Sequence, residues 1–401
     1  MTVGATAVRR RPKDRKQQIM LHARDLFVEL GYPNVSMAMI AGRIGITAGA
    51  LYRHYATKAD LLEAAVRAAF DGVAPPPPDM PPEEVIDRSI VAALGRPHLA
   101  DLWSREVRYL PDGVQREIRA VMRRATQGFV PPLRARRPAL SPEQAELMAW
   151  SIQSVLTCLA RDSVRLPATG GQALVRGAAR ELLEVRLDLG TARPRTRRPA
   201  RLTPVSTRER VLIAATRQFA AHGYQETSMA SIGAEADVTG QNLYGYFGSK
   251  SDLLRAVIVR GTHALWLELD AALAASEGPA DALTSVVAGY VRLAGNWAGL
   301  RLDLAGDPEL AEESRPVQRE YVAEWVALVR QVRPELPQPE ARALVQMALA
   351  AISDLGRTPH LAQLPGFAAS VTAIAEAILT SAPASPAVPA APSAPSAPSA
   401  P

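Results

Sequence analysis

Two sets of hydroxyl, phenol and lysine side chains recur along this 401-residue chain at a constant separation of 192 positions. Hydroxyl groups and lysine ammonium groups at the starts of helices suit phosphate oxygens, which also accept hydrogen bonds from the unpaired backbone amides there. Side chains of these types, placed at the starts of helices, are therefore chemically suited to phosphate groups. The two sets are Ser36, Thr47, Tyr52 and Lys58, and Ser228, Thr239, Tyr244 and Lys250.

The sequence offers no comparable pattern for catalysis. It has no His/Cys/Asp/Glu cluster with metal-ligand spacing, no Ser-His-acid set and no glycine-rich phosphate loop. Enzymatic activity is therefore not expected, and neither a metal nor a cofactor is expected. The single cysteine, Cys158, excludes a disulfide framework within the chain, and its apolar neighbours predict a buried, unreactive thiol.

The elements that must position the first set are short helices. Apolar residues from Ile19 to Leu30 form one helical stripe, which Gly31 ends. Ser36 is placed to cap a second helix that ends at Gly45, and Thr47 is placed to cap a third helix over residues 48–55. Two short helices joined at a glycine describe a helix-turn-helix.

The second set lies in a copy of the same segment. The copied residues need no insertion from Gly31 to Leu62, so a whole domain is duplicated. Asp237 replaces Gly45 in the second copy, which is unusual for a tight turn. Both copies also carry the capping-box spacing before a further apolar helix, at 57–60 and 249–252.

These residues resemble a known family. Ile40-Ala41, Gly45-Ile46-Thr47, Gly49, Leu51-Tyr52, Tyr55, Lys58 and Leu61-Leu62 look like the DNA-binding domain of TetR-type repressors, and the second copy matches through Ile232-Gly233, Val238-Thr239-Gly240, Asn242-Leu243-Tyr244, Tyr246-Phe247, Ser249-Lys250 and Leu253-Leu254. The basic run at residues 9–16 and Leu102-Trp103-Ser104-Arg105-Glu106 resemble actinobacterial tandem regulators of mammalian-cell-entry and lipid operons.

The resemblance implies which residues face double-stranded DNA. The third helix of each unit enters the major groove while flanking residues contact phosphates, and Leu51 and Leu243 belong to the core. The implied DNA-binding residues are Ser36, Thr47, Ala48, Ala50, Tyr52, His54 and Lys58, and Ser228, Thr239, Gly240, Asn242, Tyr244, Tyr246 and Lys250. Gln241 and Asn242 have the chemistry to read adenine edges. The first unit has no such pair: His54 and Arg43 are nearby, and the family pattern points Arg53 sideways.

Charge is concentrated on the two copies. The formal net charge is +6, yet residues 9–62 carry ten Lys/Arg and four Asp/Glu, and residues 193–254 carry nine and five. Such basic segments suit a polyanion. The sequence has no apolar run of membrane-spanning length and no secretory signal at its start, so we expect a cytoplasmic protein.

The length fits two domains of about 190 residues each, and no segment alternates with the period of a strand, which predicts an all-α fold. The resemblance implies that these domains are two TetR-like units in one chain. The expected divisions are a basic arm (1–14), helix-turn-helix domain 1 (15–62), helical effector domain 1 (63–190), a basic linker and arm (191–206), helix-turn-helix domain 2 (207–254), effector domain 2 (255–381) and an Ala/Pro/Ser tail (382–401) without a core. Expected effector-domain helices cover 83–94, 97–110, 112–130, 142–164 and 171–189, then 250–275, 280–297, 307–333, 338–357 and 366–380.

The resemblance also implies an apolar effector cavity in the helical domains, which suits a small lipid-like or acyl ligand. Aromatic and polar residues of those helices are the candidate walls, against the alternative of ordinary core packing. They are Trp103, Glu106, Tyr109, Phe129, Met148 and Trp150 in the first half, and Trp266, Tyr290, Asn296, Trp297, Asp303, Tyr321, Trp325 and Met347 in the second.

Three further expectations concern how the chain works. The two halves should pair within one chain as a pseudo-dimer, with a homodimer of four reading heads as the alternative. Arginines at 9–11 and 195–201 should act as DNA arms. Because the recognition segments differ, the operator of this expected repressor should not be a palindrome. The competing interpretation is a ligand-sensing interaction protein that functions as a homodimer and keeps one helix-turn-helix only for structure.

Overall fold

The computed structural model describes residues 12–96, 98–161, 164–190, 202–296 and 308–385. Over these residues every regular element is a helix, in agreement with the expected all-α fold. The first half contains α1 (Pro12–Leu30), η1 (Tyr32–Asn34), α2 (Met37–Ile44), α3 (Ala48–Tyr52), α4 (Lys58–Phe70), α5 (Pro82–Leu94), α6 (Leu99–Asp101), η2 (Leu102–Glu106), η3 (Val107–Tyr109), α7 (Asp112–Gln127), α8 (Val130–Arg136), α9 (Pro142–Thr157), η4 (Cys158–Ala160) and α10 (Gly171–Glu181).

The second half repeats the plan with fewer and longer helices. Its elements are α11 (Thr207–Glu226), α12 (Met229–Ala236), α13 (Gly240–Tyr246), α14 (Lys250–Ala275), α15 (Pro279–Asn296), α16 (Pro308–Val332), α17 (Gln338–Gly356) and α18 (Phe367–Thr380). The bounds of α14 to α18 lie within one or two residues of the expected helices. In the first half, α9 and α10 end at Thr157 and Glu181, before the expected ends at 164 and 189.

The two halves differ most after the helix that follows the helix-turn-helix. α14 runs for 26 residues without a proline, whereas α4 stops after 13 residues. Gly72 has a φ of 67°, and four consecutive prolines from Pro75 to Pro78 follow it. Proline lacks the amide hydrogen that would continue a helix, so the first half must turn where the second continues.

The expected helix over 97–110 is wrong as a single element. His98 adopts a left-handed conformation with a φ of 69°, and the chain then passes through α6, the π-helical η2 and the 3-10 turn η3. The expected helix over 112–130 is also divided, because Pro131 and Pro132 begin a new helix, α8. Gly128 marks the break: a Cβ there would lie 2.5 Å from Pro76 Cδ, so only glycine fits.

Over the described residues, the buried apolar side chains form three cores. One joins the first helix-turn-helix domain, including Phe27 and Leu51, to residues of η2, η3 and α7. Another joins the second helix-turn-helix domain, including Phe219 and Leu243, to Leu310 of α16. The third is shared by the two helical domains and joins residues of α9 and α10 to residues of α17 and α18. Since this largest core spans both halves, neither helical domain is packed independently.

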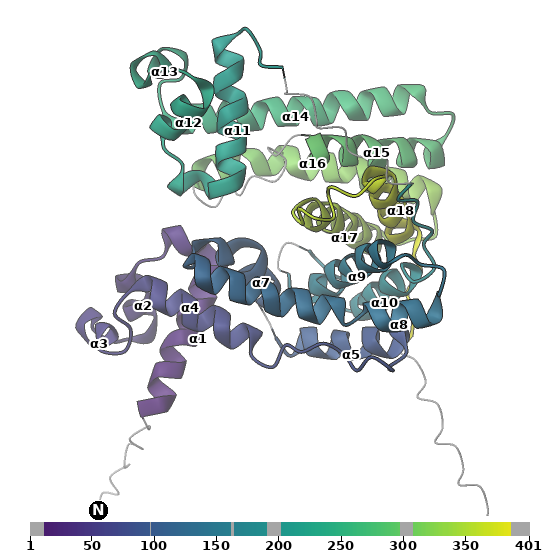
Figure 1. Cartoon of the computed structure of the whole chain (residues 1–401), viewed down its shortest axis with the longest axis horizontal. Coiled ribbons are helices and arrows are strands. Elements are labelled where there is room, and N and C mark those ends of the chain that lie inside the picture. Colours follow the sequence, from purple (N-terminus) through teal and green to yellow (C-terminus); the bar gives the residue numbers. More distant parts are fainter. Residues whose placement is uncertain (1–11, 97, 162–163, 191–201, 297–307, 386–401) are drawn as a thin grey trace, which may run out of the picture.

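The shared core determines where the two helix-turn-helix units lie. In Figure 1, α9, α10, α17 and α18 gather on one side of the molecule, and α11–α13 and α1–α3 lie one above the other on the opposite side. A single chain therefore presents both helix-turn-helix units from the same side.

Candidate DNA-binding interface

The first helix-turn-helix is built from α2 and α3. Ser36 accepts a hydrogen bond from the Met39 amide (3.2 Å) and so caps α2. Gly45 ends that helix in the left-handed region (φ 71°, ψ 38°), which costs glycine little. Thr47 then accepts from the Ala50 amide (3.2 Å) and caps α3. α3 covers only Ala48–Tyr52, shorter than the expected 48–55.

The second unit reaches the same geometry with different residues. Ser228 accepts from the Ser231 amide (3.0 Å) at the start of α12. Asp237 takes the place of Gly45 and adopts the same left-handed conformation (φ 54°, ψ 53°). α13 extends to Tyr246 and is longer than α3, and no side-chain hydrogen bond from Thr239 caps it.

The outer faces of α3 and α13 are open to solvent. Tyr52 is 52% exposed, Tyr244 is 55% exposed and Tyr246 is 44% exposed, although large aromatic side chains are usually well buried. Thr47, Ala48, Thr239 and Asn242 are also exposed, Ala50 and His54 are partly exposed, and Ser36 and Ser228 are exposed at the caps. Leu51 and Leu243 are fully buried, as expected for core residues. The faces that would meet DNA are therefore accessible in both units.

The two lysines at the starts of α4 and α14 already have partners within their own domains. Lys58 Nζ donates to the carbonyl oxygen of Tyr32 (2.8 Å) and lies 4.2 Å from the centre of the Tyr32 ring. Lys250 Nζ donates to the carbonyls of Tyr224 (2.9 Å) and Thr227 (3.0 Å) and lies 4.4 Å from the Tyr224 ring. Partial burial lowers the pKa of both ammonium groups. Each lysine thus ties its helix to the preceding turn.

Arg43 is engaged in an exposed ion pair. Its two terminal nitrogens donate to the Glu29 carboxylate at 2.9 and 3.2 Å. The corresponding residue of the second unit is Glu235, which accepts from Gln218 (2.6 Å) and pairs with Arg217. An exposed pair of this kind contributes only about 0–1 kcal/mol, so Arg43 would exchange Glu29 for a phosphate at little cost. The two units thus carry opposite charges at one position beside the reading helix.

Some of the expected contacts lie outside the described residues. They include the arginine arms at 9–11 and 195–201. The backbones of Gly240 and Gln241 lie in α13, but the Gln241 side chain is outside the described part of the structure.

Comparison with known proteins agrees with this geometry. Residues 19–65 and 211–257 each match the family model described as bacterial regulatory proteins, tetR family. The chain carries two TetR-family DNA-binding domains. Each match runs from the first helix of a unit into the helix that follows its reading helix, α4 or α14.

The similarity to individual relatives covers part of each protein. The HTH-type transcriptional repressor SCO4008 of Streptomyces coelicolor is 30% identical over 129 residues, which is 32% of this chain and 65% of that protein. An HTH-type transcriptional regulator of Staphylococcus aureus (strain USA300) is 39% identical over 64 residues, 16% of this chain and 35% of that protein. The chain thus spans less than two thirds of the length of either relative.

Two similar solved structures each cover less than half of the chain. The ketosteroid transcriptional regulator KstR2 of Mycobacterium tuberculosis is 16% identical with a TM-score of 0.39, covering 45% of this chain and 96% of that chain. The fatty acid degradation regulator FadR from Bacillus halodurans is 19% identical with a TM-score of 0.37, covering 45% of this chain and 97% of that chain.

A cavity of about 300 Å³ lies beside the first TetR-family domain. Its walls come from the proline-rich loop after α4 and from α5, α6, α7, α9 and η4, and small or apolar residues such as Ala93, Ala100 and Met122 form most of them. Arg88 and Arg96 also line it, and Arg96 Nη2 donates to the Gly72 carbonyl (2.9 Å). The cavity is therefore mainly apolar with cationic groups among its walls.

Most of the expected wall residues of the first half lie elsewhere. Phe129 does line this cavity. Trp103 instead packs against Phe70, with ring centres 5.9 Å apart, and Met148 and Trp150 belong to the helical core. These residues do not line this cavity, because their side chains fill space between helices. The choice of aromatic residues did not predict the position of the cavity, because the cavity forms where the side chains are small.

Glu106 and Tyr109 do not line the cavity either. Both contact Tyr32 of the first DNA-binding domain. Glu106 is 2% exposed and accepts from the Tyr32 amide (3.1 Å), and Tyr109 stacks on the Tyr32 ring at 5.3 Å. A Cβ at Gly223 of the second TetR-family domain would lie 4.0 Å from Tyr109 Oη. The turn that follows the cavity wall therefore contacts the first DNA-binding domain and lies close to the second, a role that the sequence did not indicate.

Aromatic residues of the second half form a packed cluster. Tyr321 lies between Trp266 and Tyr290 with ring centres 5.8 and 6.3 Å away, and Trp325 is fully buried beside them. Burial raises the pKa of Tyr290 to about 12. Met347 is also fully buried in the shared core. The expected wall residues Trp297 and Asp303 and the Asn296 side chain lie outside the described residues.

Within the described ranges no group of three or more His, Cys, Asp and Glu residues is arranged to hold a metal ion. Among the helices of those same ranges, none is both long enough and apolar enough to cross a membrane.

Proposed function

We propose that the chain is a transcriptional regulator that uses its two TetR-family domains together on one DNA site. The carrying observation is that both reading units lie on the same side of one molecule, joined by a helical core that the two halves share. In two-fold dimers with helix-turn-helix units, two subunits supply the two reading helices. Here one chain supplies both.

The operator proposed for this chain is asymmetric. The shared Thr and Tyr residues suit phosphate contact, while the exposed residues between them differ. Asn242 and Gln241 would read one half-site, with about 1–3 kcal/mol of discrimination for each good bidentate contact. The other half-site would depend on DNA shape and on His54 or Arg43, whose counterpart Glu235 would repel phosphate.

A small apolar effector with an anionic end would occupy the cavity beside the first domain. The apolar walls suit a hydrocarbon body, and Arg88 and Arg96 suit a carboxylate or phosphate group. The turn at Glu106 and Tyr109 connects that cavity wall to the first DNA-binding domain and lies close to the second, which gives an effector a route to change their separation. Release of a repressor from DNA is the proposed result, as the name of the Streptomyces relative supports repression.

The DNA-binding proposal is tested by selecting bound fragments from a genomic library and measuring affinity at several salt concentrations. The selected site is then compared with two artificial palindromes, one made from each half-site. We expect the natural site to bind more tightly than either palindrome. Equal binding of a palindrome would contradict two distinct readers, and loss of one half-site without effect would reveal a unit kept for structure only.

The effector proposal is tested by mass spectrometry of small molecules that copurify with the protein, followed by variants of the cavity. Ala93→Phe would fill the cavity and should abolish release by the effector while DNA binding persists. Val91→Phe is the matched control, because Val91 lies on the same helix, α5, but is 71% exposed and does not line the cavity. Equal responses of the two variants would place the effector elsewhere.

The arginine arms are proposed to insert into the DNA minor groove on either side of the reading helices. Replacing the arginines at 9–11 or 195–201 by serine should weaken binding and flatten its salt dependence. An unchanged salt slope would refute this role.

A further inference from the structure

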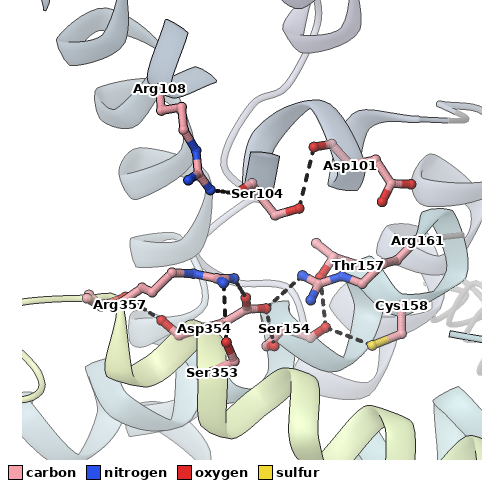
Figure 2. Close-up of polar contacts among 11 residues, drawn as sticks. Asp101, Ser104, Arg108, Ser154, Thr157, Cys158, Arg161, Ser353, Asp354 and Arg357 are labelled. Carbon is pink, nitrogen blue, oxygen red and sulfur yellow. Dashed lines mark hydrogen bonds and ion pairs between the residues drawn. The ribbon is translucent and has the colours of Figure 1, made fainter. Parts of the chain in front are cut away.

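A polar network lies inside the interface between the two helical domains, where α9 of the first half packs against α17 of the second. Asp354 is its centre (Figure 2). Its Oδ2 atom accepts from Ser154 Oγ (2.6 Å) and from Arg161 Nη2 (2.8 Å), both in the first half. Its Oδ1 atom accepts from Arg357 of its own helix. One carboxylate therefore accepts hydrogen bonds from two arginines that belong to different halves.

The ends of the two helices correspond residue by residue. Leu159-Ala160-Arg161 matches Leu355-Gly356-Arg357 at a separation of 196 positions, which makes Arg161 and Arg357 equivalent. The same separation makes Cys158 the counterpart of Asp354. The two halves thus present equivalent arginines but only one acid between them at this position.

The single acid at this position matters because Arg161 and Asp354 are both largely buried. The Arg161 side chain is 8% exposed and the Asp354 side chain is 18% exposed. Burial alone would raise the pKa of Asp354, but Arg161, Arg357 and the Ser154 hydrogen bond lower it below its usual value. The acid is therefore charged and matched to the donors around it. A buried arginine that loses such an acceptor is strongly destabilised.

We propose that Asp354 makes the pairing of the two helical domains heterotypic, so that a first half accepts a second half and rejects a copy of itself. In a pair of first halves, Cys158 would stand where Asp354 stands. Ser154 and Arg161 of each copy would then lose the carboxylate to which they donate. Asp101, which also attracts Arg161, belongs to the first half and would remain, but it ranks behind Asp354 in its effect on that arginine.

A pair of second halves would also lose contacts. Asp354 would keep an arginine, yet Ala350 would replace Ser154 at the same separation of 196 positions. His360 Nε2 lies 3.0 Å from Glu146 Oε1 across the interface, and the equivalent of Glu146 is Arg342. A second-half pair would therefore place Arg342 opposite His360. Both homotypic pairs are poorer than the pair in the chain.

The test keeps the full chain for folding and separates the halves afterwards. A protease site is placed between Gly190 and Leu202, the folded protein is cut, and native mass spectrometry follows the pairs during dilution. The decisive variants are Asp354→Ser and the double variant Cys158→Asp/Asp354→Ser, which moves the acid to the equivalent position of the other half. Serine avoids the second cysteine beside Cys158 that the single variant Asp354→Cys would create.

We expect only heterotypic pairs from the cut wild type. Asp354→Ser should weaken pairing about tenfold or more, and Cys158→Asp/Asp354→Ser should recover most of that loss. Glu117→Ser is the control, because it removes an acid that pairs with Arg67 within the first half and away from this interface. It should leave pairing unchanged.

The proposal is overturned if pairs of first-half fragments form as readily as mixed pairs, or if Asp354→Ser pairs like the wild type. It is also overturned if the double variant pairs no better than Asp354→Ser, since the acid would then not act through its position between the equivalent arginines. Circular dichroism of each uncut variant shows whether a loss of pairing reflects general unfolding. None of these outcomes depends on DNA binding.

Discussion

Replacing Lys58 or Lys250 by methionine separates the structural role of each lysine from its role on DNA. Methionine keeps an unbranched stem but cannot donate a hydrogen bond. Lys58 has one close carbonyl contact and one ring contact, whereas Lys250 has two close carbonyl contacts and a ring contact. A hydrogen bond contributes about 1 kcal/mol, and an exposed cation–π contact about 0.5–1 kcal/mol.

These contacts give a different stability loss for each variant. Lys58→Met should lower the free energy of unfolding by about 1–2 kcal/mol and Lys250→Met by about 2–3 kcal/mol. Urea unfolding followed by circular dichroism measures both values. The difference between the variants is the more reliable quantity, because it reflects one additional carbonyl contact.

The same variants should change the salt dependence of DNA binding equally. Each lost phosphate contact reduces the slope of log K against log salt concentration by about 0.9. Arg292→Met is the control, because it removes one positive charge from α15, where Arg292 pairs with Glu268, away from the reading units. Fluorescence anisotropy from 50 to 300 mM salt, about the range in which such slopes are resolved, measures the effect.

The reasoning fails if the lysine variants keep the wild-type salt slope while losing stability. The lysines would then only tie helices to turns. It also fails if Arg292→Met flattens the slope as much, since the effect would then come from net charge.

Three further predictions concern the turn, the interface and the thiol. Gly45→Ala should lower stability by about 1–2 kcal/mol and Asp237→Gly should raise it by a smaller amount, because both positions are left-handed; equal effects in thermal unfolding would contradict this. The pKa of Asp354 is lowered in the folded protein, so its contribution is complete above the usual value of 3.8 and is lost as pH falls through the folded pKa. Asp354→Asn should therefore reduce the loss of stability as pH falls below about 4, and an unchanged pH dependence in that range would count against it. Burial raises the pKa of Cys158 to about 12, so a thiol reagent at pH 8 should label it only on unfolding; labelling of the folded protein within minutes would show that it is accessible.

Much of the fold could be predicted because local signals agreed with tertiary packing. α14 begins at a serine cap and continues without proline, so its bounds of Lys250–Ala275 follow from the sequence. The turn at Asp237 was foreseen from its alignment with Gly45. The segment 97–110 could not be foreseen, since the buried contact of Glu106 with the Tyr32 amide depends on residues 74 positions away.

The exposed reading faces were easier to predict than the cavity. Reading residues lie at fixed positions after a capped turn, so a duplicated motif identifies them. A cavity is defined by missing side-chain volume, and Ala93 and Ala100 give no distinctive signal in the sequence. The role of Asp354 needed the structure as well, because only the packing of α9 on α17 brings Arg161 to it.

The number of chains bound to one selected operator tests the central claim most directly. Light scattering of the purified complex at saturating protein should give one chain, about 43 kDa of protein, for each operator. That result would mean that both reading units of one molecule occupy a single asymmetric site. Two chains on each operator would contradict the account, because the halves of different molecules would then share the reading of DNA.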